Sequence, residues 1–262
     1  MEKKVTEKVF VYFLKKKVMI KADLHIHTVL SPCGDIEMTP ANIIRRARES
    51  GLGVIGVTDH NSTRQCAEVR RIGEREGLFV LCGAEITTRE EAHVLAFVEG
   101  DEKLAELQEF LDENLAPIPN RPEHFGYQVV VDEREQVLYE EETLLISAID
   151  RSVEEVEAFV RSLGGIFIPA HINKPRNSLL SQLGFVPPYL RVDALEVSHR
   201  CDLDALLEEH PYLSDYRFVR SSDAHHLEEI GLASISLDIE TPSFENIKDA
   251  LHNSPFEGGR GM

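Results

Sequence analysis

The sequence of 262 residues has four cysteines, no long apolar run and a shortage of basic charge. The cysteines, at positions 33, 66, 82 and 201, form no CxxC spacing. They therefore predict neither a disulfide framework nor a zinc knuckle, and they fit a reducing cytoplasm. Apolar runs such as LFVLCGA are too short to span a bilayer, so we expect no membrane partner. No GxGxxG fingerprint follows a predicted strand, which disfavours a dinucleotide-binding domain.

The charge balance also excludes some partners. There are 28 Lys and Arg residues against 46 Asp and Glu residues, for a net charge of −18. Such a chain is not expected to bind long duplex nucleic acid or an anionic membrane through a basic surface. Divalent cations would cancel part of the negative charge at a site. The hydrophobic content of 42% is that of an ordinary globular protein, and the length suits one α/β barrel.

Strand-like and helix-like segments alternate along the chain. Strands are predicted at 18–27, 52–60, 78–87, 92–99, 164–171, 192–199, 216–225 and 233–240, and helices at 40–51, 62–76, 102–114 and 152–163. Near-continuous apolar strands between helices predict a parallel sheet covered on both faces, and seven or eight such units favour a closed barrel. The proline-bearing segment 115–150 breaks this pattern and is predicted to be a small hairpin or an insertion. Residues 1–17 are predicted to be an N-terminal extension, 18–255 the barrel and 256–262 a flexible tail.

Ionisable side chains gather at the ends of these strands. Asp23, His25 and His27 share one face of the first strand because alternate residues point the same way. Seven of the eleven histidines lie at or near strand ends: His25, His27, His60, His93, His171, His199 and His225. The accompanying acidic residues are Asp23, Asp35, Asp59, Glu85, Glu196 and Asp223. In a barrel, strand ends converge on one mouth, where active sites are built. His93 begins its apolar run, so an antiparallel or distorted strand is needed to bring it there.

A set of imidazoles and carboxylates without cysteine pairs suits zinc, manganese or iron, with magnesium as a further option. There are more potential ligands than one tetrahedral ion needs, so we expect two or three divalent ions. Metals would also explain how so many ionisable groups lie together, since their charged forms are otherwise strongly disfavoured.

Five ordered motifs resemble those of a known family. DLHIHT, GVTDHNS, GAEIT with AHVLAF, IPAHINKP and RSSDAH resemble the successive motifs of the PHP (polymerase and histidinol phosphatase) family of metal-dependent phosphoesterases. The resemblance covers about residues 18–240. It implies a distorted (β/α)7 TIM-like barrel, the PHP fold, with a bi- or trinuclear metal centre at its mouth.

The resemblance also implies ligands, position by position. The matching metal ligands are His25, His27, His60, Glu85, His93, His171, Asp223 and His225. Glu85 matches the carboxylate expected to bridge two metals. Asp23 and Asp59 are expected to orient the histidines through their free ring nitrogens.

The loop after HxH, SPCGD, departs from the commonest family pattern. Asp35 is the preferred ligand there, as a hard carboxylate suited to Mn²⁺, Mg²⁺ or Zn²⁺. Cys33 is the alternative and would favour zinc, unless it only packs under the loop.

These features predict hydrolysis of a phosphate monoester or diester through a metal-activated water. The substrate is expected to be a small metabolite, a nucleotide or a short oligonucleotide. Candidate proton-transfer residues are Asp59, His199 and Asp223, and His199 is alternatively a substrate or metal contact. The predicted phosphate-binding cations are Lys174, Arg176, Arg200 and Arg220. Each of them is alternatively a solvated charge on a loop. Segment 115–150 is the predicted lid or specificity element.

Two other functions remain open. One is histidinol-phosphate phosphatase, although no residue specifies an imidazole-bearing substrate. The other is a non-catalytic, metal-stabilised regulatory PHP module, which predicts missing ligands. A metal-dependent amidohydrolase is disfavoured because no strand ends in a suitably placed lysine. The sequence makes no prediction of oligomeric state.

Overall fold

The computed structural model describes residues 18–253. The predicted N-terminal extension and flexible tail lie outside the described residues, and the domain boundaries remain predictions. The strands are β1 (Val18–Ile26), β2 (Val54–Val57), β3 (Phe79–Thr87), β4 (His93–Val98), β5 (Val129–Val131), β6 (Val137–Glu140), β7 (Ile166–Pro169), β8 (Leu195–Val197), β9 (Phe218–Arg220) and β10 (Ile235–Ile239). The helices are α1 (Pro40–Glu49), α2 (Cys66–Glu76), α3 (Asp101–Asn114), α4 (Pro122–Phe125), α5 (Val153–Ser162), α6 (Leu179–Leu183), α7 (Leu203–Glu209) and α8 (Phe244–Asn253), with 3₁₀ turns η1 (Pro211–Asp215) and η2 (Leu227–Glu229).

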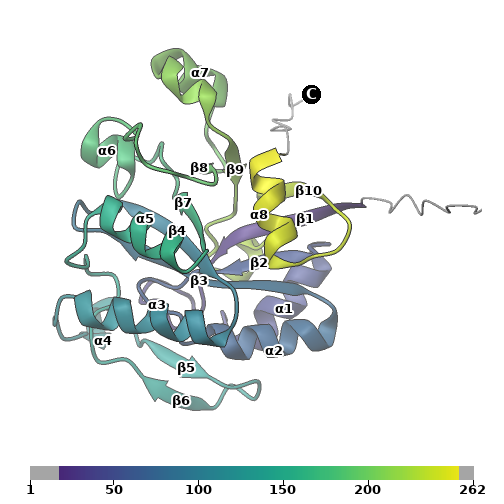
Figure 1. The fold of residues 1–262 in the computed structure, drawn as a ribbon. Helices are drawn as coiled ribbons and strands as arrows, with labels where there is room; N and C mark the ends of the chain where they lie inside the picture. Colours follow the sequence, from purple (N-terminus) through teal and green to yellow (C-terminus); the bar gives the residue numbers. More distant parts are fainter. Residues whose placement is uncertain (1–17, 254–262) are drawn as a thin grey trace, which may run out of the picture.

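The main sheet has six strands in the order β10-β1-β2-β3-β4-β7 (Figure 1). Strands β1, β2 and β3 are parallel, whereas β4 is antiparallel to β3 and β7, and β10 is antiparallel to β1. The expectation of an all-parallel sheet was therefore wrong for β4 and β10. Only residues 88–92 join β3 to β4, which is too short for a crossover helix. The antiparallel β4 pairs His93 with Thr87, so His93 starts its strand at the mouth, as the prediction required.

The sheet curls into a half-barrel, and hydrogen bonds beyond it continue the curl. The amide of Asp193 donates to the carbonyl of Phe167, which links β7 to the parallel pair β8-β9. A parallel bridge between Ile26 and Ala224 then returns to the end of β1. The mixed α/β architecture confirms the predicted distorted, TIM-like fold.

Sequence signals for helix ends are seen in the structure. Ser152 and Glu155 form a capping box at the start of α5, and α2 ends at Gly77 in the left-handed conformation. Thr39 precedes Pro40 at the start of α1, but its hydroxyl donates to Glu135 instead of capping the helix. No helix of residues 18–253 is long and apolar enough to cross a membrane.

The interior of the curled sheet is filled by large side chains opposite glycines. Phe97 is fully buried, and its ring lies against Gly56 and Gly83. A methyl group added at Gly83 would lie 1.9 Å from the carbonyl oxygen of Ala96, so the close approach of β3 and β4 requires glycine there. A second apolar layer separates the sheet from helices such as α2 and α5. These two packed layers hold in place the strand ends at which the ionisable residues lie.

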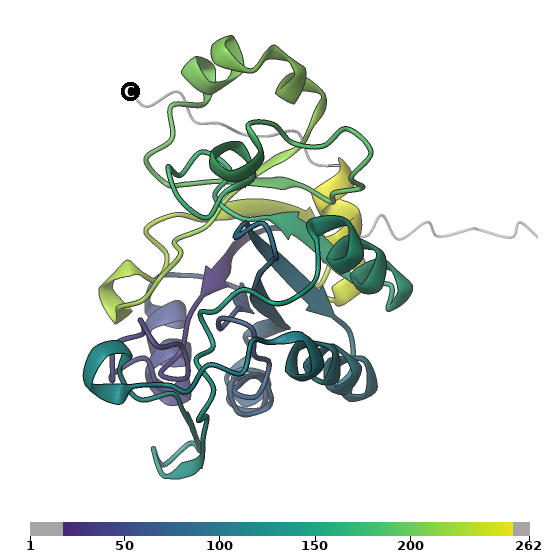
Figure 2. The same cartoon turned by 90° about the vertical axis from the view of Figure 1, so that its left-hand side faces the viewer.

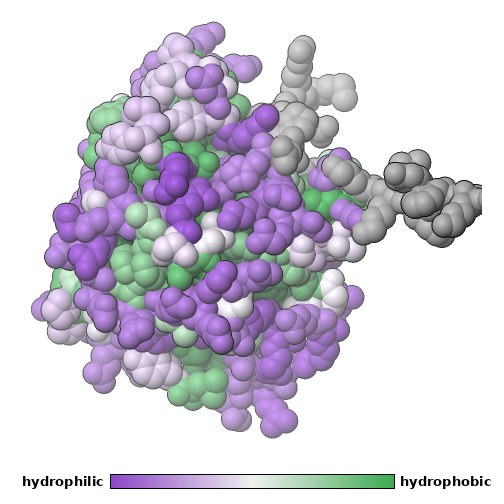
Figure 3. All heavy atoms as spheres, viewed as in Figure 1, coloured by the Kyte–Doolittle hydropathy of each residue, from purple (hydrophilic) through white to green (hydrophobic). Residues whose placement is uncertain are grey.

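Segment 115–150 contains α4 and the two-stranded hairpin β5-β6, as one of its predicted forms required. Asn61 donates to the carbonyls of Leu145 and Ser147 and so ties the segment to the mouth. In Figure 2, α4 lies at the same side as the loop that follows β1. The hairpin carries exposed apolar residues, including Val137 at 60% exposure, and Figure 3 shows a green area at the lower edge of the molecule, where the hairpin lies in Figure 1.

Candidate metal centre

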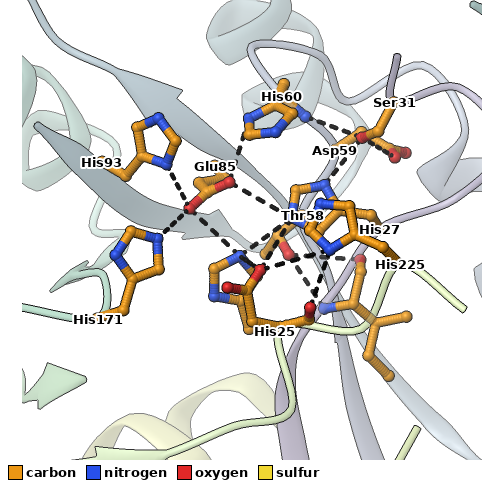
Figure 4. A network of polar contacts seen from close by, with 12 residues as sticks. His25, His27, Ser31, Thr58, Asp59, His60, Glu85, His93, His171 and His225 are labelled. Atoms are coloured by element: carbon orange, nitrogen blue, oxygen red, sulfur yellow. Dashed lines mark hydrogen bonds and ion pairs between the residues drawn. The ribbon is translucent and has the colours of Figure 1, made fainter. Parts of the chain in front are cut away.

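The predicted ligands come from separate strands and meet at one place (Figure 4). They lie at the end of β1 (His25, His27), after β2 (His60), within β3 (Glu85), at the start of β4 (His93), after β7 (His171) and after β9 (Asp223, His225). All are buried except Asp223 and His225, which are partly buried. The segment from the first of these ligands to the last includes most of the described residues, so the complete fold is needed to assemble the cluster.

Glu85 lies at the centre of the cluster and is 1% exposed. Five rings each place one nitrogen within 3.3 Å of its carboxylate: His25, His27, His60, His93 and His171. Oε1 faces His93 at 2.8 Å, His171 at 3.0 Å and His25 at 3.3 Å. Oε2 faces His60 at 3.1 Å and His27 at 3.3 Å. Each oxygen therefore serves its own set of imidazoles, which is the arrangement of a carboxylate that bridges two cations.

The charges at the centre are mutually dependent. Burial by itself would raise the pKa of Glu85, but the surrounding imidazoles, His93 foremost, lower it well below its usual value. Burial would likewise lower the pKa of His25, yet the carboxylates of Glu196, Asp223 and Glu85 raise it well above the usual value. Positive charge on His25 is thus favoured by the carboxylates around it.

The ring nitrogens that face away from the centre have hydrogen-bond acceptors. Nδ1 of His25 donates to Glu196 at 3.0 Å, and Nδ1 of His225 donates to the carbonyl of Asp223 at 2.9 Å. Nδ1 of His27 lies 2.9 Å from the hydroxyl of Ser31. In a neutral ring each of these contacts leaves the lone pair of Nε2 free to bind a cation.

Two further observations show that the donors fit metal ions. Nδ1 of His60 is buried and has no hydrogen-bond partner among residues 18–253, although Oε2 of Glu85 lies 3.1 Å away. Nε2 of His25 and Nε2 of His27 face each other at 3.2 Å, an approach that needs a proton or a cation between them. Three overlapping sets of donor atoms lie within 4.8 Å of one another: His25, His27 and Asp223; His60, Glu85 and His93; and His27, Cys33, His60 and His225.

Glu196 is the main residue whose role the sequence did not predict. It lies in β8 and is 2% exposed, and besides contacting His25 it accepts the amide of His171 at 2.9 Å. It therefore orients two predicted ligands at once. In the sequence Glu196 was one of the acidic residues near strand ends, but the role predicted for its strand was assigned to His199.

Asp59 lies behind the cluster and holds it indirectly. Its carboxylate accepts hydrogen bonds from the amide and hydroxyl of Thr28 and from the hydroxyl of Ser31. Ser31 in turn accepts from Nδ1 of His27, so Asp59 orients that ring through one intervening hydroxyl. With both oxygens engaged and 1% exposure, Asp59 is placed to position a ligand, not to exchange protons with substrate.

Asp23 has a different role from the one expected. Its oxygens accept the amides of Ser222 and Gly231, both at 2.9 Å, and no described contact joins it to a histidine ring. The strand register shifts between Asp23 and Ile26, which separates this carboxylate from the rings that follow. Burial raises its pKa to about 6. Asp23 thus anchors the segment that carries Asp223.

His93 is held by a residue that the sequence did not indicate. The side-chain amide of Asn177 lies 3.0 Å from Nε2 of His93, and the carbonyl of Asn177 accepts the amide of His93 at 3.0 Å. Asn177 adopts φ of 56°, a conformation that asparagine tolerates better than most residues.

A cavity of about 470 Å³ opens beside the cluster and provides space for a substrate. Its lining includes His171, Lys174, His199, Arg200 and Asp223. Lys174 forms an ion pair with Oδ2 of Asp223. His199 and Arg200 are exposed at the rim, where Nε of Arg200 donates to Nε2 of His199.

The other two predicted cations lie elsewhere. Arg220 donates to the carbonyls of Ser198, His199 and Cys201, so its guanidinium supports the loop after β8. Arg176 is exposed and is not part of the described lining of the cavity.

The loop after β1 brings Cys33, not Asp35, into a donor set. Although Cys33 is exposed, its sulfur lies among the cluster, where desolvation and the carboxylate of Glu85 raise the thiol pKa to about 12. Ligation by either residue stays a prediction.

Known proteins resemble this chain in sequence and in fold. The family described as PHP domain matches residues 23–162, more than half of the chain. The chain is 27% identical to the uncharacterized protein YqxK of Bacillus subtilis over 88% of this chain and 62% of that protein. The first two curated relatives are matched over 53% and 62% of their own lengths.

Two solved structures share the fold. The lesion-specific endonuclease PfuEndoQ of Pyrococcus furiosus superposes with a TM-score of 0.69 at 18% identity, over 91% of this chain and 57% of that one. A candidate metal-dependent phosphoesterase from Bifidobacterium adolescentis superposes with a TM-score of 0.59 at 21% identity, over 91% and 98% of the two chains.

Proposed function

The chain belongs to the PHP domain family, and from that premise we propose that it is a metal-dependent phosphoesterase that hydrolyses small phosphate esters. The observation that carries the proposal is Glu85, whose two oxygens face separate sets of imidazoles. One ion would be held by His60, Glu85 and His93, and another by His25, His27 and Asp223. Such ions supply an activated water and neutralise charge on the phosphoryl group.

The cavity residues would bind and orient the ester. Lys174, after β7, and Arg200, after β8, both line the cavity, where their cations can pair with phosphate oxygens. Lys174 would exchange its contact with Asp223 for the substrate. His199 lies at the rim with Nε2 accepting from Arg200, which leaves Nδ1 to hold a proton for the departing oxygen. Asp59 has no such access.

Cavity size and charge favour a small substrate. A volume of about 470 Å³ suits a phosphorylated metabolite, a nucleotide or the end of a short oligonucleotide. The net charge of −18 disfavours a long polyanion. The fold likeness to an endonuclease makes a diester substrate the second candidate. The donor sets present here support an enzyme over a degenerate regulatory module, which would lack ligands.

The test is a substrate panel on metal-reconstituted protein. We would compare p-nitrophenyl phosphate, bis-p-nitrophenyl phosphate, histidinol phosphate, nucleoside bisphosphates and short oligonucleotides with Mn²⁺, Zn²⁺ or Fe²⁺. We expect hydrolysis that EDTA abolishes and that Lys174→Ala weakens mainly through KM. Absence of hydrolysis with every ester and every metal would overturn the proposal.

A further inference from the structure

One of the three donor sets contains a sulfur atom. Cys33, His27, His60 and His225 each offer one ligand atom, and the four atoms lie within 4.8 Å of one another. His27 and His60 also belong to the other two sets, so Cys33 and His225 are the donors particular to this one. The proposed hydrolysis does not by itself require a thiol at this place.

The loop geometry places the thiol. The amide of Ser31 donates to Thr28 and the amide of Gly34 donates to Ser31, which makes two successive tight turns. A methyl group at Gly34 would lie 2.2 Å from the carbonyl oxygen of Thr28, so only glycine permits this path. The amide of Asp35 then donates to the carbonyl of His225 at 2.9 Å and fastens the loop to the segment after β9.

The same path turns the carboxylate of Asp35 away from the donors. Oδ1 of Asp35 accepts the amide of Glu37 at 2.8 Å, and Oδ2 lies 3.6 Å from Nδ1 of His226. Asp35 belongs to none of the donor sets found among the described residues. The carboxylate expected from the sequence is therefore engaged in the loop itself.

The nitrogens are prepared for a cation independently of the sulfur. Nδ1 of His225 donates to the carbonyl of Asp223, and Nδ1 of His27 is engaged by Ser31, so both rings present Nε2. Nδ1 of His60 is buried and lacks a hydrogen-bond partner among residues 18–253. A buried imidazole nitrogen without a partner is costly unless a ligand occupies it.

We propose that Cys33 is a thiolate ligand which, with His225 and the shared histidines, makes one position of the centre selective for zinc. Cysteine and histidine are the preferred donors of zinc, whereas the carboxylates of Glu85 and Asp223 also suit harder ions. When the sulfur–zinc bond forms, the S–H bond breaks and its proton passes to solvent. This inference shares with the proposed function only the premise that the centre binds metal ions.

Cobalt substitution tests the sulfur directly. The full chain is stripped with chelator and titrated with Co²⁺, and the near-ultraviolet absorption from thiolate to cobalt is recorded. We expect this band in the natural sequence, its loss in Cys33→Ser and its retention in Asp35→Asn. Cys201→Ser is the matched control, because Cys201 is the other cysteine that is not buried. Circular dichroism checks that each variant is folded.

Metal competition gives a second measurement. Cys33→Asp exchanges the thiolate for a carboxylate, so the preference for Zn²⁺ over Mn²⁺ should fall at least about tenfold. A natural protein without the thiolate band, or a band that survives in Cys33→Ser, would overturn the inference. A band that depends on Cys33 in a protein inactive on every ester would leave the inference standing and remove the proposed function instead.

Discussion

Replacement of Glu85 by glutamine gives the sharpest test of the bridging arrangement. The substitution keeps the size of a side chain that is 1% exposed, but it exchanges one oxygen for an NH₂ group and removes the charge. Whichever way the amide turns, one set of imidazoles loses the anionic oxygen that it faces, so two ions can no longer share this side chain.

The expected size of the effect follows from linkage. Ions at 100 times their dissociation constant stabilise the native protein by about 2.7 kcal/mol. In a chain of this length that corresponds to a rise in Tm of roughly 5 to 11 °C. Loss of a partner that only orients a ligand weakens metal binding about 10- to 100-fold, and loss of the ligand itself should cost no less. At a 100-fold loss the same ion concentration would raise Tm of Glu85→Gln by only about 1 to 2 °C.

Differential scanning calorimetry with and without Mn²⁺ measures this difference, and elemental analysis gives the ion content. Glu106→Gln is the matched control, because it makes the same exchange at an exposed position of α3. The bridging role would be refuted if Glu85→Gln kept the full metal-dependent rise in Tm and the full ion content of the natural sequence.

Four other substitutions test the groups behind the ligands and the packing of the fold. Glu196→Gln weakens the acceptor of the His25 ring, so calorimetric titration should show metal affinity about 10- to 100-fold lower; unchanged affinity would refute this. Asn177→Gly suits φ of 56° but removes the amide, so metal affinity should fall about tenfold without loss of stability to urea. Gly83→Ala should lower the free energy of unfolding by about 3 kcal/mol, because its methyl group meets β4; an unchanged urea midpoint would contradict this. Ser152→Ala should cost about 1 kcal/mol in the same assay through loss of the α5 cap, whereas equal midpoints would mean that the cap is dispensable.

Much of the cluster was predictable because its residues end apolar strands. His25, His27, His60 and Glu85 each lie at or near the end of a strand whose apolar pattern is clear in the sequence, and parallel strand ends meet at one edge. His93 was predictable only with the condition that its strand be reversed, and the short link between β3 and β4 supplies that reversal.

The groups behind the ligands were not predictable. His25 and Glu196 are 171 residues apart, and nothing local in either strand indicates that their side chains meet. The role of Arg220 could not be predicted either. A cation near the mouth is expected to bind phosphate, and only the structure shows that this guanidinium donates to backbone carbonyls. The sequence preference for Asp35 over Cys33 did not include the two tight turns of this loop, in which Cys33 and not Asp35 lies in a donor set.

The bridge between Ile26 and Ala224 has a consequence for how the chain folds. It joins the first barrel strand to a segment almost 200 residues later, and such distant pairings form slowly because the intervening chain must already be ordered. Predicted ligands flank it, since the amide of His27 donates to Ala224 and His225 follows directly. Ions bound by these ligands would hold the two bridged segments together on both sides of the bridge. The proposed metal centre would then also determine when the barrel closes, so metal supply would influence the yield of folded protein as well as the proposed activity.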